Sequence, residues 1–295
     1  MRKVLVNIMK AVVCGAVFFA GNMVASIAVA MIGIPTPAAP DGTDPARLVL
    51  GLLAASLGIG ALLAYLSGRI TASWPLRWMV LASFGWIIYS FTNNLEASIY
   101  TTYASASIYK LVTDLAAFLL CGLTAARLFA PVLPACQQAA GRSAGSWAWR
   151  LIVLEIAFPV IYLSFGKLIE PFVIDFYRQG QMGLAAPGWD QIIPMQLLRS
   201  LLFLAVSLPV IFLWTGSRRS LWASLAAALF LLTGGFYMIQ AYWYPASFRL
   251  LHSLEILCDS AVYGGALALL LFNPVEKTAG ERAAQVQPSL EGAPK

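Results

Sequence analysis

The chain has 295 residues, of which 60% are hydrophobic and 11% are Asp, Glu, Lys or Arg, and its mean hydropathy is +0.78. A soluble domain carries about 25% charged residues, so this composition excludes an ordinary cytosolic enzyme, a disordered protein and a disulfide scaffold. The net charge of +6 does not predict nucleic-acid binding, because the basic residues lie at the ends of apolar stretches. The sequence therefore predicts an all-α polytopic membrane protein.

About eight apolar stretches, in chain order, are long enough to cross a bilayer core, which needs about 20 helical residues. They lie at about 11–34, 47–67, 78–98, 106–131, 150–173, 194–214, 221–243 and 249–272. We therefore expect a single transmembrane helical domain over 1–272. Residues 273–295 mix Pro, Gly, Ala, Gln and charge without an apolar period, which predicts a disordered cytoplasmic tail.

The distribution of Lys and Arg predicts the orientation of the bundle. With the N-terminus inside, thirteen of the nineteen basic residues lie on the inner side, and three (Arg47, Arg178 and Arg249) lie outside. An excess of basic residues is typical of cytoplasmic segments. Both termini are therefore predicted to be cytoplasmic, in a multi-pass protein of the cytoplasmic (inner) membrane.

A stripe of polar side chains runs along the predicted eighth span. His252, Glu255, Asp259 and Tyr263 are spaced at i, i+3, i+7 and i+11, which places them on one face of a helix. Ionisable residues are costly inside a membrane and are functional candidates by default. These four residues are therefore predicted to bind a substrate or protons.

Similar stripes, each with an aromatic residue and a charge, occur in two further spans, and Arg199 opens the sixth. The members are Tyr89, Asn93, Glu96 and Tyr100 in the third span, and Tyr103, Ser107, Lys110 and Asp114 in the fourth. If these stripes face inward, they form one polar cavity in the outer half of the bundle. Its predicted binding residues, besides those of the eighth span, are Asn93, Glu96, Lys110, Asp114 and Arg199.

The outer half of the bundle contains more acids than cations. The acids are Glu96, Asp114, Glu170, Glu255 and Asp259, and the cations are Lys110, Lys167 and Arg199. A buried carboxylate without a cation takes up a proton or binds a cation. Because Glu255 and Asp259 are one turn apart, we expect them to share a proton or a cation, which His252 exchanges with water at the cavity mouth.

Structural roles stay open for several of these residues. Lys110 can pair with Asp114 along its own helix, and such pairs also hold membrane helices together. A single histidine such as His252 can equally be a hydrogen-bonded scaffold residue. With one histidine and four scattered cysteines, the sequence predicts no metal site and no cofactor.

Three functions are compatible with the sequence. A proton- or cation-coupled carrier needs the stripes to face one another around a cavity that takes a small molecule or cation from the outer side. A non-catalytic partner, such as a sensor or assembly subunit of a larger membrane complex, needs the charges to pair off fully. An intramembrane enzyme on a lipid-linked substrate needs an accessible acid or nucleophile, and the sequence favours an enzyme least. In all three cases the lipid bilayer is the surrounding partner.

An internal repeat is indicated only weakly. Residues 103–105 read Tyr-Ala-Ser and residues 244–247 read Tyr-Pro-Ala-Ser, ahead of the fourth and eighth spans. A duplication of four plus four helices would be parallel, because each half has an even number of spans. The match alone is too short to establish such a repeat.

Overall fold

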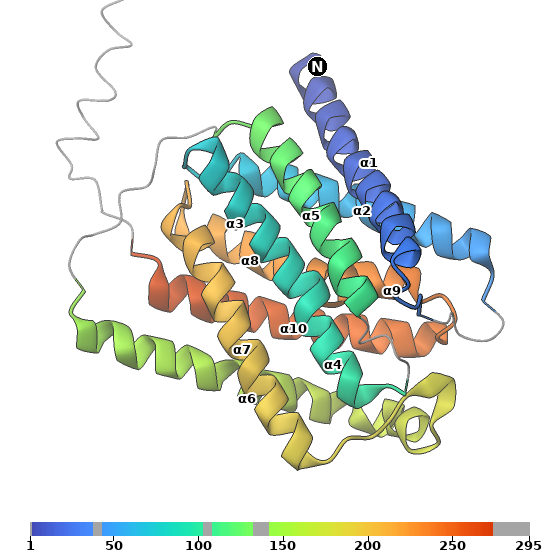
Figure 1. Cartoon of the computed structure of the whole chain (residues 1–295). Coiled ribbons are helices and arrows are strands. Elements are labelled where there is room, and N and C mark those ends of the chain that lie inside the picture. The colour runs from blue at the N-terminus through green and yellow to red at the C-terminus, as the bar shows by residue number, and fades with distance from the viewer. Residues whose placement is uncertain (1, 38–42, 103–107, 132–141, 274–295) are drawn as a thin grey trace, which may run out of the picture.

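The computed structural model describes residues 2–37, 43–102, 108–131 and 142–273. Of these residues, 84% are helical and none belongs to a strand, which confirms the predicted all-α fold. The predicted tail from residue 274 onward, together with Tyr103 and Ser107 of the fourth-span stripe, lies outside the described residues. The order of the helices can be followed in Figure 1.

The helices fall into two sets on either side of the gap at 132–141. The first set is α1 (Arg2–Met31), α2 (Pro45–Ser67), α3 (Trp74–Trp86), η1 (Ile87–Phe91), α4 (Thr92–Tyr100) and α5 (Ile108–Leu128). The second set is α6 (Ala144–Arg178), η2 (Gln181–Gly183), α7 (Trp189–Phe212), α8 (Arg218–Phe230), η3 (Leu231–Gly235), α9 (Phe236–Gln240) and α10 (Ala246–Leu271). The elements η1 and η3 are single π-helical turns inside otherwise continuous helices.

Seven of the described helices are long and apolar enough to cross a membrane, namely α1, α2, α5, α6, α7, the continuous segment α8–α9, and α10. The predicted third span at 78–98 is helical throughout α3, η1 and α4 but is not among the seven. Thr92, Asn93 and Asn94 lower its hydropathy. It packs inside the bundle against α5 and α7, so a polar sequence is tolerated there. Its crossing of the membrane stays a prediction.

The second set of helices repeats the first at a nearly constant spacing along the chain. Helices α3 and α8 both have 13 residues and begin at Trp74 and Arg218. The π-helical turns η1 and η3 both have five residues and begin at Ile87 and Leu231, which are separated along the chain by the same interval as Trp74 and Arg218. A π-turn is rare, so its recurrence at one spacing is strong evidence of an internal repeat.

Bonds between helices recur in the same way. The indole nitrogen of Trp78 donates to the carbonyl of Leu119 at 2.8 Å, and that of Trp222 donates to the carbonyl of Ala261 at 2.8 Å. The two tryptophans occupy the same position in their helices, because each is the fifth residue of α3 or α8. When η1 and α4 are counted with α3, and η3 and α9 with α8, each half has four long helices among the described residues. Each bond joins the third helix of its half to the fourth, α3 to α5 and α8 to α10.

Basic side chains cap the last turn of the fourth helix in each half. Lys10 of α1 donates to the carbonyl of Leu128 at 3.2 Å, and Arg150 of α6, the first helix of the second half, donates to the carbonyl of Leu270 at 2.7 Å. Cations near a helix C-terminus satisfy its last carbonyls and interact favourably with its dipole. The repeated caps place basic residues at one end of the bundle, as the positive-inside pattern expects.

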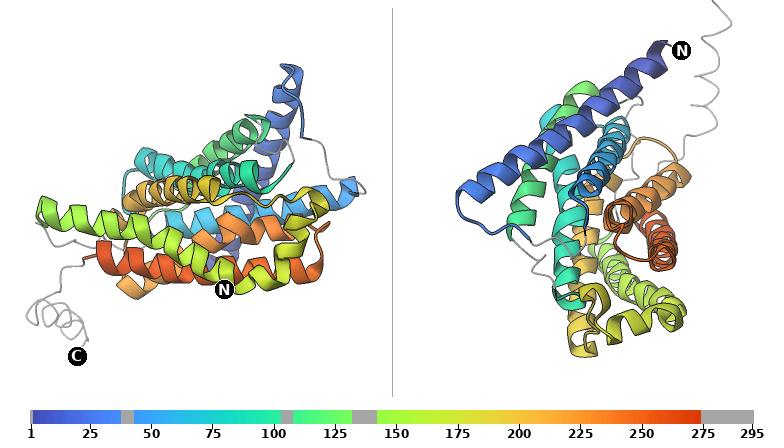
Figure 2. Two further views of the ribbon diagram at one scale, coloured as in Figure 1. Left: turned by 90° about the horizontal axis from the view of Figure 1, so that it is seen from below. Right: turned by 90° about the vertical axis from the view of Figure 1, so that its right-hand side faces the viewer.

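The two halves meet in a reciprocal contact between their short second loops. The backbone nitrogen of Thr71 donates to the carbonyl of Leu213, and that of Thr215 donates to the carbonyl of Arg69, both at 2.8 Å. Because Thr215 follows Thr71 at the spacing of the repeat, as Leu213 follows Arg69, the halves are related by a pseudo-two-fold axis. The turns η1 and η3 touch near this axis, and Figure 2 shows α1 and α6, the first helix of each half, on opposite sides of the molecule.

Candidate functional site

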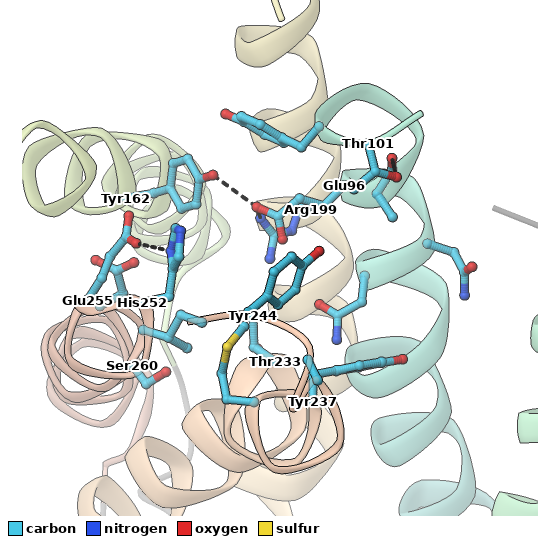
Figure 3. A pocket seen from close by; sticks show the side chains of 18 of the residues that line it. Glu96, Thr101, Tyr162, Arg199, Thr233, Tyr237, Tyr244, His252, Glu255 and Ser260 are labelled. Carbon is cyan, nitrogen blue, oxygen red and sulfur yellow. Dashed lines mark hydrogen bonds and ion pairs between the residues drawn. The ribbon is translucent and has the colours of Figure 1, made fainter. Parts of the chain in front are cut away.

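A cavity of about 460 Å³ lies between α4, α6, α7, α9 and α10, toward the end of the bundle opposite the basic caps. Its wall includes eight of the nine predicted binding residues: Asn93, Glu96, Lys110, Arg199, His252, Glu255, Asp259 and Tyr263. The ninth, Asp114, lies behind the wall and bonds to Lys110. Figure 3 shows His252 and Glu255 on one side of the cavity, and Glu96 and Arg199 on the other.

Arg199 of α7 forms a buried ion pair with Glu96 of α4. Its Nη1 atom lies 2.6 Å from Glu96 Oε1, and the arginine side chain is only 1% exposed. The hydroxyl of Tyr162 donates to the same carboxylate oxygen at 2.9 Å. The guanidinium also lies 5.5–5.7 Å from the ring centres of Phe158, Tyr162 and Phe203, a distance suited to cation–π attraction. The arginine charge is therefore neutralised and held in place.

Lys110 of α5 is also paired with an acid. Its Nζ atom lies 2.7 Å from Asp114 Oδ2, and Asn22 of α1 donates to the other carboxylate oxygen at 2.9 Å. The ammonium group sits 5.0 and 4.9 Å from the ring centres of Tyr89 and Tyr237, which stack on each other. The structure thus contains the Lys110–Asp114 pair that the sequence allowed as a structural element, with Lys110 at the cavity wall.

His252 links two residues of the cavity wall. Its Nδ1 atom lies 2.8 Å from Glu255 Oε2, and its Nε2 atom lies 3.2 Å from the Tyr177 hydroxyl. A neutral imidazole protonated at Nδ1 would donate to Glu255 and accept from Tyr177. The three side chains then form a continuous hydrogen-bonded chain from α6 to α10. Gly166 of α6 makes room for it, because a Cβ atom there would come within 3.2 Å of Glu255 Oε1.

Asp259 lies one helical turn beyond Glu255 and is 6% exposed. Its Oδ1 atom is buried and has no hydrogen-bond partner among the described residues. The three cations that were counted together with these acids in the sequence bond to other acids: Arg199 to Glu96, Lys110 to Asp114, and Lys167 to Glu170. Of the five acids counted in the sequence, Glu255 and Asp259 are therefore the two that have no lysine or arginine partner within the described part of the chain.

Two short segments that border the cavity pair with each other. The nitrogen of Ala185 donates to the carbonyl of Tyr100 at 2.8 Å, and the nitrogen of Thr102 donates to the carbonyl of Gly183 at 2.7 Å. Leu184, Tyr100 and Thr101 line the cavity beneath this bridge. These two bonds join the loop after α6 to the end of α4.

The place in the first half that corresponds to Thr233 at the cavity border is occupied by an aromatic side chain. Tyr89 stands where the second half has Thr233, because each is the third residue of its π-turn. The ring of Tyr89 is 1% exposed and stacks on Tyr237 with ring centres 4.7 Å apart. Thr233 instead borders the cavity, so the two halves differ in the volume that they leave open.

Sequence reasoning missed several residues of the cavity wall. Tyr162 of α6 hydrogen-bonds to Glu96 and Tyr177 to His252. Tyr237 and Gln240 of α9 complete the side next to α4. Tyrosines are common at membrane interfaces, so their presence in a span gave no distinctive signal. Among the described residues, no three His, Cys, Asp or Glu side chains are grouped so that they could hold a metal ion.

Comparison of this chain with known proteins adds no relative. No family model, no curated protein and no solved structure matches it.

Proposed function

We propose that this integral membrane protein is a carrier that couples the passage of its ligand to the binding and release of a proton or cation. The observation that supports this proposal is the pair of cavity acids, Glu255 and Asp259, without a lysine or arginine partner. A carboxylate in such surroundings is too costly to remain charged alone, so it takes up a proton or binds a cation. A ligand and a proton can then exchange at one site.

The hydrogen-bonded chain through His252 supports the proton side of this mechanism. An imidazole accepts a proton on one nitrogen while it releases another from the second. With Tyr177 on Nε2 and Glu255 on Nδ1, such a transfer would move a proton along the cavity wall. The next carboxylate after Glu255 that could accept the proton is Asp259, one turn further along α10.

The internal repeat also favours a carrier. Many carriers consist of two structural repeats, and alternating access follows when one repeat rocks against the other around a central site. Here the cavity is walled by α6, α7 and α10 of the second half and by α4 of the first. A non-catalytic partner protein would instead be expected to pair its intramembrane charges completely, and Asp259 Oδ1 has no partner in the described part of the chain.

Orientation can be tested with reporters that fluoresce or are enzymatically active on only one side of a membrane. We expect a reporter fused after Lys295 to read cytoplasmic, and one inserted at Gly183 to read exterior, because thirteen basic residues lie on the predicted inner side and three outside. The opposite pair of readings would place the cavity on the cytoplasmic side and reverse the proposed direction of ligand entry.

Proton binding can be tested without knowledge of the ligand. The full chain is reconstituted in liposomes on a solid-supported membrane, and the external pH is stepped from about 8 to about 6, across the range where free imidazole titrates. A proton that enters the cavity moves charge within the membrane and gives a transient current. We expect Asp259→Asn to reduce the displaced charge to less than half, because the amide keeps the shape and cannot titrate.

The matched control is Glu155→Gln, which removes another carboxylate of a spanning helix, one that does not line the cavity. The charged and titratable groups that line the cavity with Asp259 include Glu255 and His252 on α10, Arg199 on α7, Glu96 on α4, and Tyr162 and Tyr177 on α6. If wild type and Asp259→Asn displace equal charge, the proton-coupled carrier is excluded.

A further inference from the structure

The wall of the cavity carries both charged and apolar side chains. The carboxylates of Glu255 and Asp259 lie on α10, Glu96 and Arg199 lie on the opposite side (Figure 3), and apolar and aromatic side chains cover much of the remaining surface. These apolar residues are Phe158, Phe203, Met238, Trp243, Phe248 and Ile256. A ligand that matches both parts has one polar group and an apolar body.

The charge of the polar group follows from which cavity charges are already neutralised. Arg199 is bonded to Glu96, and Lys110 to Asp114, so the charge of each cation is already balanced by an acid. Asp259 has a buried oxygen with no donor among the described residues. Because the cavity cations are balanced and Asp259 is not, the charge balance of the cavity favours a cationic ligand that donates to Asp259.

A metal ion does not match this environment. Ca²⁺ takes about 6–8 oxygen ligands, and no group of three metal-ligating side chains occurs among the described residues. An ammonium group needs only a few acceptors, and its carbon substituents gain free energy from apolar surroundings. The volume of about 460 Å³ lies within the range of small-molecule pockets, about 300–1,000 Å³.

We propose that the cavity binds a protonated amine with a ring-sized apolar body, its N–H groups donating to Asp259, in exchange for a proton. This inference deepens the proposed carrier function and rests on the same site. As the ammonium arrives, the proton on the Asp259 carboxyl group leaves to the outer water, so the charge of the cavity does not change. The aromatic rings of Phe158, Trp243 and Phe248 accommodate the apolar body, and aromatic faces also attract cations.

The experiment uses three probes of one shape, 2-phenylethylamine, 2-phenylethanol and 3-phenylpropionate. Each is titrated calorimetrically into the purified full chain in detergent at about pH 8, where the amine is protonated. We expect the amine alone to bind measurably. Asp259→Asn should weaken its binding about tenfold or more, because a hydrogen bond to a charged group contributes more than a neutral one.

Two controls separate binding at the site from partition into the micelle. Glu155→Gln should bind the amine like wild type, and a titration into the same detergent without protein measures partition. A third measurement needs no variant. Lowering the pH to about 6 should weaken amine binding to wild type by up to about tenfold per pH unit, because protons compete for the same carboxylate.

Equal binding of the amine and the alcohol, or no effect of both Asp259→Asn and pH, would overturn the inference. Amine binding without charge displacement in the pH step would support the ligand class and exclude the coupled carrier. Charge displacement without amine binding would support the coupled carrier and overturn the proposed ligand class. The two proposals therefore fail separately.

Discussion

Replacement of Arg199 by methionine is expected to destabilise the protein by about 3 kcal/mol, because removing one partner of a buried ion pair leaves the other charge uncompensated. Glu96 would lose the guanidinium at 2.6 Å and keep only the hydroxyl of Tyr162. The contacts of the guanidinium with three aromatic rings would be lost as well. Thermal unfolding in detergent, followed by circular dichroism, measures the loss.

A double variant distinguishes the stranded charge from simple loss of packing. Arg199→Met combined with Glu96→Gln removes both charges, so we expect it to be more stable than Arg199→Met alone. The control pair is exposed: Arg47 lies 3.7 Å from Asp44 with its side chain 68% exposed, and Arg47→Met should have little effect. If the double variant is as unstable as the sum of its single variants, Glu96 and Arg199 do not act as a pair.

Replacement of Gly60 by alanine is expected to separate α1 from α2. A Cβ atom at residue 60 would overlap the backbone nitrogen of Gly15 and lie 2.5 Å from its Cα atom. Backbone atoms of a helix cannot move aside as a side chain can, so the helices must shift. Overpacking of this kind typically costs about 1–3 kcal/mol, and we expect a lower unfolding temperature with a reduced yield of folded protein.

The matched control is Gly145→Ala. Gly145 also lies within a helix, α6, but nothing is within 4 Å of the position that its Cβ would take. Alanine is a better helix former than glycine, so this variant should be at least as stable as wild type. Equal stability of both alanine variants would contradict the close approach of α1 and α2.

Hydropathy predicts the apolar middle of each helix better than its ends. The predicted span 47–67 nearly coincides with α2 (Pro45–Ser67), whereas the span predicted to begin at residue 150 belongs to a helix that begins at Ala144. Trp147 is compatible with a helix but suits the membrane interface, so an apolar window that begins at residue 150 excludes it. The π-turns could not be predicted, because carbonyls in them are satisfied by distant groups. Asn93 donates to the carbonyl of Leu232 in η3, and the hydroxyl of Tyr237 donates to the carbonyl of Tyr89 in η1.

Which residues surround the cavity was more predictable than which residues pair. Charged residues inside a membrane must face protein or water, so helical spacing alone indicated that His252, Glu255 and Asp259 face inward. The partner of Arg199 is Glu96, which belongs to a helix in the other half of the chain, and no local spacing connects them. Long-range pairing depends on how the two halves dock, which periodicity within one helix does not encode.

The reciprocal loop contact around Thr71 and Thr215 has an evolutionary consequence. Two halves related in this way are what remains when a gene for a four-helix subunit is duplicated and fused, and the ancestral molecule would then have been a homodimer with two identical chambers. Once both copies lay in one chain, a substitution no longer changed two places at once. Tyr89 could then close one chamber while Thr233, its counterpart, left the other open, and a symmetric dimer became an asymmetric molecule with a cavity bordered by Thr233.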